Sequence, residues 1–307
     1  MVNEINSIVL VGPTGVGKTD LAIKLNNLIP SELISVDSVQ VYQNLDIGSG
    51  KPSESILNKH PHKLINIIPP AENYSTGLYR KDCLKAIEDT NKIKKIPILV
   101  GGTMLYFKSI FEGLSILPPK SNQIRQEIEK EALKNGWNAL HKKLEEIDPI
   151  SAKRIHPNDS QRIQRALEVF RLTQIPLSKI HSKNNRNSTD LKVHKFALIP
   201  ESREEHRSKV SLRFKQMLEQ GLVNEVEDIL SMKGVDKNSQ SLNSIGYKQV
   251  CQFLDNEISY DEMVTKAINS TRQFAKRQMT WIRSLDDIIS ISDAIEDRVS
   301  YIMERIK

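Results

Sequence analysis

The chain has 307 residues, of which 38% are hydrophobic and 27% are charged, as expected of a globular protein with a buried core. Its net charge of +6 and pI near 9.1 permit a nucleic-acid partner without requiring one. The two cysteines provide no disulfide or metal framework, and no apolar run is long enough for a signal peptide or a membrane span, so we expect a cytoplasmic protein.

The first predicted strand, residues 8–11, leads into a phosphate-loop motif of glycine, four residues, then Gly-Lys-Thr. The motif consists of Gly12, Pro13, Thr14, Gly15, Val16, Gly17, Lys18 and Thr19. A helix is predicted next, over residues 18–29, from leucines spaced three and four apart. Backbone N–H groups of such a loop converge on one anion, Lys18 adds positive charge, and the Thr19 hydroxyl is placed to ligand Mg²⁺. The motif predicts a polyphosphate or diphosphate site and leaves the reaction open.

Strands and helices alternate through the first third of the chain. We expect further strands at residues 33–36, 64–68 and 98–100, and a long helix at 76–94. This order predicts an α/β fold, a parallel sheet of the P-loop nucleoside-triphosphatase type flanked by helices. Ligands of such sheets lie beyond the carboxyl ends of the strands, where the phosphate loop, residues 37–40 and residues 101–103 would meet.

Two of these strand ends bear on the chemistry. Asp37 follows a predicted strand, and two roles stay open for it: an ordinary turn or cap residue, or a carboxylate that accepts a proton from a nucleophile. The strand at 98–100 ends in Gly-Gly-Thr, where a nucleotide hydrolase usually presents an aspartate that holds Mg²⁺ through water. This difference weakens a hydrolase interpretation without excluding it.

From Pro118 onward the pattern becomes helical. Amphipathic helices are predicted at 124–132, 137–147 and 159–173, the last capped by Asp159 or Ser160. Arg162 and Arg165 lie away from its apolar face. The polar stretch 181–190 predicts a mobile loop or linker, and an apolar strand at 196–199 follows it. We therefore expect a helical insertion, after which the sheet resumes.

The remainder of the chain is predicted to be helical. The main segments are 203–220, which stops at Gly221, a helix after the turn at 243–247, and the long pattern 260–283. On the last, Arg272, Lys276 and Arg283 share an arc beside the apolar face. A solvated basic edge is sufficient explanation for one such helix, but two basic helices and a phosphate site favour an extended anionic ligand.

These motifs resemble, in order and nearly end to end, those of the tRNA dimethylallyltransferase (isopentenyltransferase, IPP transferase) family. The matching segments are residues 12–19, 35–42, 46–48 with 51–52, 101–106, 159–168, 244–247 and 272–281. Three positions depart from the family pattern. Gln174 stands where the family usually has Gly, and Ser160 stands where Pro is common after Asp159; we expect both to affect only local turn geometry. Lys209 stands where Arg is frequent and is assigned no role.

The resemblance implies transfer of the dimethylallyl group from dimethylallyl diphosphate to N6 of the adenosine 3′-adjacent to the anticodon, in tRNAs that read codons starting with U, with release of diphosphate. Its phosphate loop would hold this diphosphate rather than ATP. Asp37 would be the general base, Thr103 would contact the substrate, and Lys18 and Arg213, with Mg²⁺ on Thr19, would neutralise the leaving diphosphate.

The resemblance and the basic helices imply tRNA, through its anticodon stem-loop, as the macromolecular partner of a monomeric enzyme. The expected tRNA contacts are Asp37, Ser38, Val39, Gln40, Thr103, Arg125, Gln161, Arg162, Ile163, Gln164, Arg165, Arg272, Lys276 and Arg277. Residues 119–189 would form the tRNA-binding insertion, and residues 1–118 with 190–307 the catalytic core.

Two other functions stay open at this point. A prenyltransferase acting on free adenine nucleotides would need the same loop, but it would need neither the helical insertion nor a long basic surface. A small-molecule kinase would use the loop for ATP, and the 37–40 and 101–103 clusters count against it.

Overall fold

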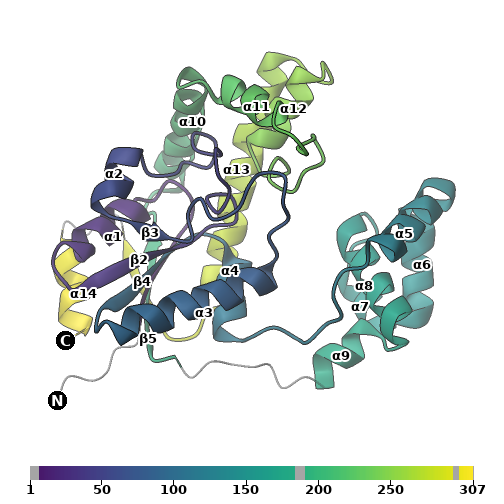
Figure 1. Cartoon of the computed structure of the whole chain (residues 1–307), viewed down its shortest axis with the longest axis horizontal. Coiled ribbons are helices and arrows are strands. Elements are labelled where there is room, and N and C mark those ends of the chain that lie inside the picture. Colours follow the sequence, from purple (N-terminus) through teal and green to yellow (C-terminus); the bar gives the residue numbers. More distant parts are fainter. Residues whose placement is uncertain (1–6, 184–190, 293–296, 307) are drawn as a thin grey trace. The chain divides into compact units, whose positions relative to one another are not determined.

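The structure, a computed structural model, describes residues 7–183, 191–292 and 297–306 (Figure 1). The chain divides into two compact units, residues 1–111 with 190–307 and residues 112–189. The first unit contains a sheet flanked by helices, and the described part of the second consists of helices and loops. No helix within the described ranges combines the length and the apolar character needed to cross a bilayer.

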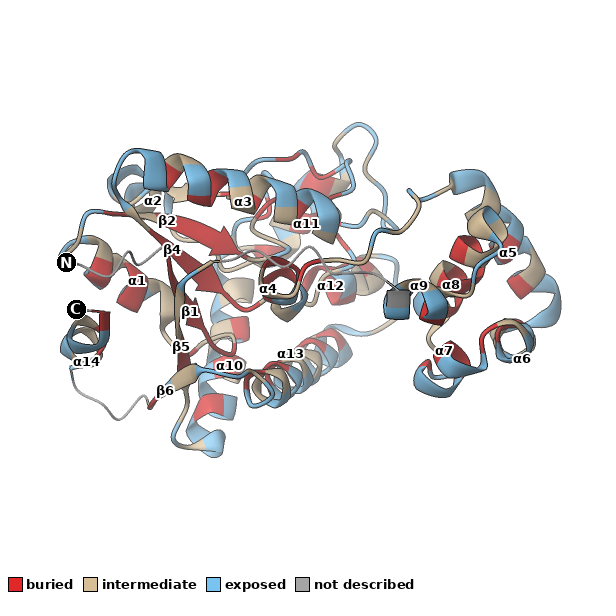
Figure 2. Ribbon diagram, turned by 90° about the horizontal axis from the view of Figure 1, so that it is seen from below, coloured by how far each residue is buried: buried red, intermediate tan, exposed pale blue. Residues whose placement is uncertain are grey.

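Among the described residues, the first unit is built on six parallel strands in the order β3-β2-β4-β1-β5-β6. They are β1 (Ser7–Val11), β2 (Ser31–Val36), β3 (His62–Lys63), β4 (Ile96–Gly101), β5 (Val193–Ile199) and β6 (Ile288–Ser292). The predicted parallel α/β sheet is confirmed. β1, which leads into the phosphate loop, lies between β4 and β5, so the loop is near the middle of the sheet edge (Figure 2).

The helices of this unit cover both faces of the sheet. They are α1 (Lys18–Asn26), α2 (Glu54–Lys59), α3 (Thr76–Lys92), α4 (Met104–Phe111), α10 (Arg203–Glu219), α11 (Leu222–Leu230), α12 (Tyr247–Leu254), α13 (Tyr260–Ile282) and α14 (Arg298–Ile306). Because side chains alternate along a strand, Ile8 and Leu10 pack with α1 and α14, while Val9 and Val11 pack with α3, α4 and α13. Figure 2 shows the central strands β1, β2 and β4 as the most continuously buried part of this unit.

Burial of both faces explains why the strands read as continuous apolar runs. The side chains of Ile8, Val9, Leu10 and Val11 are each at most 1% exposed. Burying one such side chain stabilises the fold by about 1.5–3 kcal/mol. The run of β-branched residues therefore fixes β1 rigidly, and the loop that follows it begins from a fixed point.

Two sequence predictions in this unit are wrong. The strand predicted at 64–68 does not form, because Leu64 and Asn66 take left-handed backbone conformations with φ of 65° and 57°. The strand β3 ends just before them, and Ile68 makes only an isolated bridge to Tyr42. The C-terminal region is also not helical throughout, since β6 pairs in parallel with β5 at the sheet edge.

Other helix boundaries agree with the sequence. The helix predicted at 260–283 forms as α13 and begins with a capping box in which Ser259 and Glu262 satisfy each other's backbone N–H groups. The helix predicted at 203–220 forms as α10, and Gly221 follows it with φ of 99°.

The second unit packs its helices around its own apolar cluster. Its helices are α5 (Asn122–Asn135), α6 (Trp137–Ile147), α7 (Pro149–Arg154), α8 (Ser160–Thr173) and α9 (Leu177–Lys183). Asp159 caps α8, as predicted, by accepting from Arg162 N at 3.1 Å. Gln174 ends α8 in a left-handed conformation with φ of 57°, where glycine would be unstrained. Residues 181–183 of the linker predicted at 181–190 instead form the end of α9, and the rest of that stretch lies outside the described residues.

Candidate active site at the carboxyl ends of the strands

The phosphate loop joins β1 to α1 in a conformation suited to an anion. Gly15 and Gly17 have φ of 80° and 87°, a region that other L-residues rarely adopt. Backbone curvature of this kind allows successive N–H groups to converge on one anion. The N-terminus of the nine-residue helix α1 adds its partial positive charge at the same place. The ammonium group of Lys18 donates to Pro13 O within the loop at 2.8 Å.

Three charged side chains interact at this edge of the sheet. Desolvation lowers the pKa of Lys18 to about 8, and it also lowers the pKa of the Arg213 guanidinium on α10. The carboxylate of Asp37 acts against the lowering of both pKa values, whereas the positive charge of Arg213 lowers the pKa of Lys18 further. Two partly dehydrated cations and one carboxylate therefore share a small region, which an added polyanion would stabilise.

Asp37 occupies the turn directly after β2. Its Oδ1 accepts from Val39 N at 2.8 Å and from Gln40 N at 3.2 Å, so the sequence expectation of a turn-capping role describes one of its oxygens. Among the described residues, none hydrogen-bonds Oδ2. The two roles left open for Asp37 therefore do not compete, because one oxygen fixes the turn and the other stays available to a ligand.

Thr103 ties the end of β4 to the end of β2. Its Oγ1 accepts from Ser38 N at 3.0 Å, and its backbone N–H donates to Val36 O at 3.1 Å. Two strand ends and the Asp37 turn are thus joined by direct hydrogen bonds. The predicted cluster of the phosphate loop, residues 37–40 and residues 101–103 lies along one edge of the sheet.

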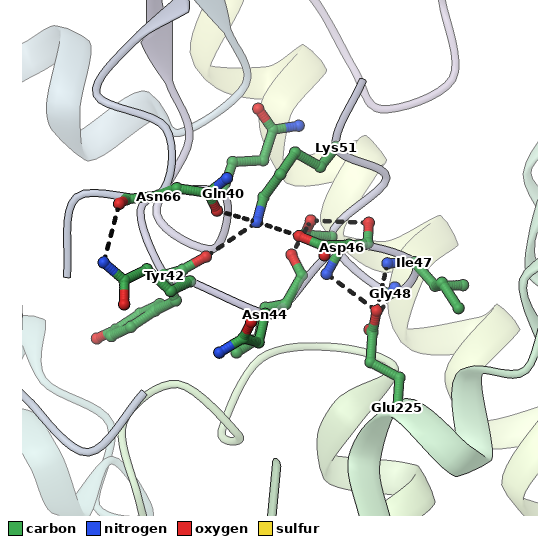
Figure 3. Close-up of polar contacts among 12 residues, drawn as sticks. Gln40, Tyr42, Asn44, Asp46, Ile47, Gly48, Lys51, Asn66 and Glu225 are labelled. Carbon is green, nitrogen blue, oxygen red and sulfur yellow. Dashed lines mark hydrogen bonds and ion pairs between the residues drawn. The ribbon is translucent and has the colours of Figure 1, made fainter. Parts of the chain in front are cut away.

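Polar contacts hold the loop at residues 44–51 in place (Figure 3). Glu225 of α11 accepts from three consecutive backbone N–H groups, those of residues 46, 47 and 48, at 3.0, 2.6 and 3.1 Å. Lys51 donates to Tyr42 O at 3.0 Å and pairs with the side chains of Asp46 and Asn66. These bonds give the loop one conformation.

The loop at residues 44–51 contacts Gln40 and Arg213 through one carbonyl oxygen. The Gly50 oxygen accepts from Gln40 Nε2 at 3.4 Å and from Arg213 Nη2 at 3.3 Å. Arg213 is thereby oriented by the loop, and Gln40 is oriented by the loop together with Ser35, whose hydroxyl donates to Gln40 Oε1 at 3.1 Å. Sequence reasoning missed Glu225, although Tyr247, which donates to it at 2.6 Å, belongs to one of the motifs.

Comparison with known proteins assigns this chain to a family. The family model described as IPP transferase matches residues 40–285. A tRNA dimethylallyltransferase from Nitrosomonas europaea is 44% identical over 294 residues, which are 96% of this chain and 92% of that protein. The chain belongs to the IPP transferase family.

Solved structures of this family have the same architecture. A full-length tRNA isopentenylpyrophosphate transferase from Bacillus halodurans is 31% identical, with a TM-score of 0.69 over 99% of this chain and 95% of that chain. A tRNA delta(2)-isopentenylpyrophosphate transferase from Staphylococcus epidermidis is 32% identical, with a TM-score of 0.69 over 98% and 99%. A eukaryotic dimethylallyltransferase acting on tRNA is 26% identical, with a TM-score of 0.80 over 98% and 77%.

Thr19, the predicted magnesium ligand, is the second residue of α1 and directly follows Lys18 in the sequence. Within the described ranges, no group of three or more His, Cys, Asp or Glu side chains is placed to hold a metal ion. Mg²⁺ commonly binds one or two protein oxygens and completes its shell with phosphate oxygens and water. A single hydroxyl beside a phosphate loop fits that mode of binding.

In the helical unit of this IPP transferase, the predicted tRNA contacts fall into two groups. Arg162 is 73% exposed and pairs only with Asp159 among the ion pairs of the described residues, while Gln161 is also exposed. Ile163 is fully buried in the apolar cluster of the unit, so its side chain is not presented to a ligand. Gln164 is 7% exposed and donates to Arg125 O and to Glu129.

Arg125 and Arg165 are engaged inside the same unit. Both pair with Glu168, whose side chain is fully buried, at 3.0 Å and 2.7 Å. Glu168 also accepts from Ser121 N at 2.8 Å, and Arg165 donates to Pro118 O at 2.7 Å. The two guanidinium groups therefore anchor the start of the unit to α8, a role that the sequence did not indicate.

The cations predicted on α13 remain at the surface. Arg272, Lys276 and Arg277 are all exposed, and Arg272 donates to Ser211 Oγ on α10 at 2.9 Å. The adjacent Gln278, in contrast, is 2% exposed and turns into the protein. The helix therefore presents a basic edge on one side and a buried polar group on the other.

Proposed function

We propose that this chain transfers the dimethylallyl group of dimethylallyl diphosphate to N6 of the adenosine 3′-adjacent to the anticodon, in tRNAs that read codons starting with U, and releases diphosphate. Transfer of a dimethylallyl group to tRNA follows from family membership and from near full-length similarity to a tRNA dimethylallyltransferase. The observation that carries the finer assignment is the position of the Asp37 carboxylate, within the electrostatic reach of Lys18 beside the phosphate loop.

The phosphate loop binds the diphosphate in this proposal. Its inward N–H groups and the start of α1 supply neutral donors, and Lys18 and Arg213 supply charge where the leaving group becomes more negative. Both cations are partly dehydrated in the free protein, so their interaction with the diphosphate is strong. The bond that breaks joins the prenyl carbon to a diphosphate oxygen. The electron pair of this bond leaves with diphosphate.

Asp37 removes the proton in this proposal. The N6 amine of adenine forms a bond to the prenyl carbon, and Oδ2 accepts the amine proton while Oδ1 keeps the turn closed. Thr103, whose hydroxyl is bonded to Ser38, borders the same space and contacts the substrate. An exocyclic amine is a weak nucleophile, so positioning of the two reactants supplies much of the rate enhancement.

Mg²⁺ is a proposed cofactor. Thr19 would hold it together with diphosphate oxygens, and the ion would neutralise charge on the leaving group. The protein groups act in the same direction, because Lys18 belongs to the loop and Arg213 lies within electrostatic reach of Lys18.

The tRNA is proposed to bind through exposed cations and through the strand-end turn. Arg162 with Gln161 in the helical unit, and Arg272, Lys276 and Arg277 on α13, are exposed donors for phosphates. Residues 37–40 and Thr103 would contact the adenosine, which must leave its base stack to reach Asp37. We propose that the enzyme works as a cytoplasmic monomer.

One experiment separates this function from its two alternatives. The protein is incubated with Mg²⁺ and dimethylallyl diphosphate labelled in the prenyl group, together with tRNA or with AMP, and in parallel with ATP labelled in its γ-phosphate. We expect label from the prenyl donor in tRNA alone. Label in AMP would favour a nucleotide prenyltransferase, and phosphate transfer from ATP would overturn the proposal.

A further inference from the structure

Two side chains from distant helices hold the peptide unit at Thr14 in the phosphate loop. Gln278 of α13 accepts from Thr14 N through Oε1 at 3.1 Å. His206 of α10, 9% exposed, lies with Nε2 2.8 Å from Thr14 O, and because a carbonyl can only accept, this nitrogen donates. The Thr14 N–H is thus used inside the protein, and the anion-facing donors of the loop are those that follow it.

The amide of Gln278 has a second partner on another strand end. Its Nε2 donates to Gly102 O at 2.7 Å, and the side chain is 2% exposed. The approach is so close that a Cβ at position 102 would overlap Nε2, so any larger residue there would displace the amide. Thr14 N can only donate and Gly102 O can only accept, so a neutral amide in one orientation satisfies both groups.

This amide connects the two halves of the site. Gly102 precedes Thr103, whose hydroxyl accepts from Ser38 N in the turn that Asp37 closes. On the other side, Thr14 lies four residues before Lys18 in the phosphate loop. The hydrogen bonds therefore run from the diphosphate cradle through Gln278 to the turn that carries the carboxylate.

We propose that Gln278 is a positioning residue that sets the separation between the diphosphate cradle and the Asp37 carboxylate, with His206 fixing the other side of the same Thr14 peptide. Gln278 does not line the cradle, and it acts through Thr14 and Gly102. This inference deepens the proposed function and rests on it. A small change in the distance between prenyl donor and base slows the reaction strongly, because transfer requires near-contact geometry.

The test compares Gln278→Leu and Gln278→Glu with the wild-type enzyme over pH 6.0–8.5. Leucine fills a similar volume but leaves Thr14 N and Gly102 O without partners. A protonated glutamic acid reproduces both bonds, whereas its carboxylate faces Gly102 O and repels it. The matched control is Gln216→Glu, the same change at an exposed position of α10, for which we expect rates within twofold of wild type.

Single-turnover transfer and binding of inorganic diphosphate are measured for each variant. For Gln278→Leu we expect a rate reduced roughly tenfold or more and a diphosphate Kd changed less than threefold. The tRNA concentration that gives half of the maximal single-turnover rate should be unchanged. For Gln278→Glu the rate relative to wild type should recover as the pH falls, because the buried carboxyl becomes protonated. A Gln278→Leu rate within twofold of wild type would overturn the proposal, as would equal losses for both variants at every pH.

These outcomes are separate from a failure of the proposed function. If the wild-type enzyme transfers no prenyl group to tRNA, the proposed function is wrong. If the wild type is active and Gln278→Leu is equally active, only the positioning role is wrong. Melting temperatures of the variants, measured alongside, show whether the substituted chains are folded.

Discussion

Replacement of Asp37 by asparagine isolates the catalytic use of one oxygen atom. In the wild type, Oδ1 accepts from Val39 N and Gln40 N, and the amide oxygen of the introduced side chain can accept the same two bonds. The substitution therefore keeps the turn and removes only the negative charge and the basicity of Oδ2. We expect the free energy of unfolding and the affinity for tRNA to stay close to those of the wild type.

The expected loss of rate follows from the role of the carboxylate. A positioned general base typically contributes about 10² to 10⁴ in rate, so Asp37→Asn should lower the transfer rate by that factor. Single-turnover assays with excess enzyme and saturating dimethylallyl diphosphate measure this step. The assay is best run at pH 7, because Asp37 raises the pKa of Lys18, and its loss would deprotonate that lysine further at higher pH.

Asp37→Ala provides the control. Alanine removes the turn acceptor as well as the base, so it should lower the free energy of unfolding by about 1–3 kcal/mol, which Asp37→Asn should not do. A single-turnover rate for Asp37→Asn within threefold of wild type would refute the reasoning, since the charge on Oδ2 would then have no part in the chemistry.

Two further predictions concern the cations. Diphosphate raises the pKa of Lys18 from its value of about 8 in the free protein, so near pH 8.5 the wild type should take up more protons on binding than Lys18→Met does. Calorimetry of inorganic diphosphate in two buffers of different ionisation enthalpy measures this difference, in which the ligand's own protons cancel. The same buffer dependence for both proteins would contradict it. Arg162→Ala should weaken tRNA binding and reduce by about one the slope of log affinity against log salt concentration. Arg165→Ala should weaken tRNA binding too, and in addition it should lower the free energy of unfolding by up to about 3 kcal/mol, because the buried Glu168 loses a partner. Equal stability of the two variants would contradict the second prediction.

The phosphate loop and its surroundings were predictable because their signals are local. A β-branched run, positive-φ glycines and a helix start lie within about a dozen residues, and parallel pairing then brings the ends of β2 and β4 beside the loop. The absence of a strand at 64–68 was not predictable, because the apolar residues there favour one. The left-handed conformations of Leu64 and Asn66 depend on tertiary contacts, including those of Lys51 with Asn66.

The polar residues that organise the site from a distance were harder to find. Gln278 lies on the same face of α13 as Ala275 and Ile282, so a polar side chain on an apolar face was the available signal. Its partner Thr14 is 264 residues away, and no spacing in the sequence connects them. Arg125 and Arg165 were predicted as tRNA contacts, but both pair with the buried Glu168. The helical periodicity of the sequence does not reveal this burial.

The central claim, that an anion cradle and a carboxylate act together on one adenine, is tested most directly by analysis of the modified nucleoside. tRNA incubated with the enzyme, Mg²⁺ and dimethylallyl diphosphate is digested, and its nucleosides and sequenced fragments are identified by mass spectrometry. The account predicts N6-dimethylallyladenosine on the 3′ side of the anticodon in wild-type reactions. With Asp37→Asn the same product should form at least roughly 100-fold more slowly, which is the lower end of the contribution of a general base. A prenyl group on another atom or nucleoside, or equal product from Asp37→Asn, would contradict it.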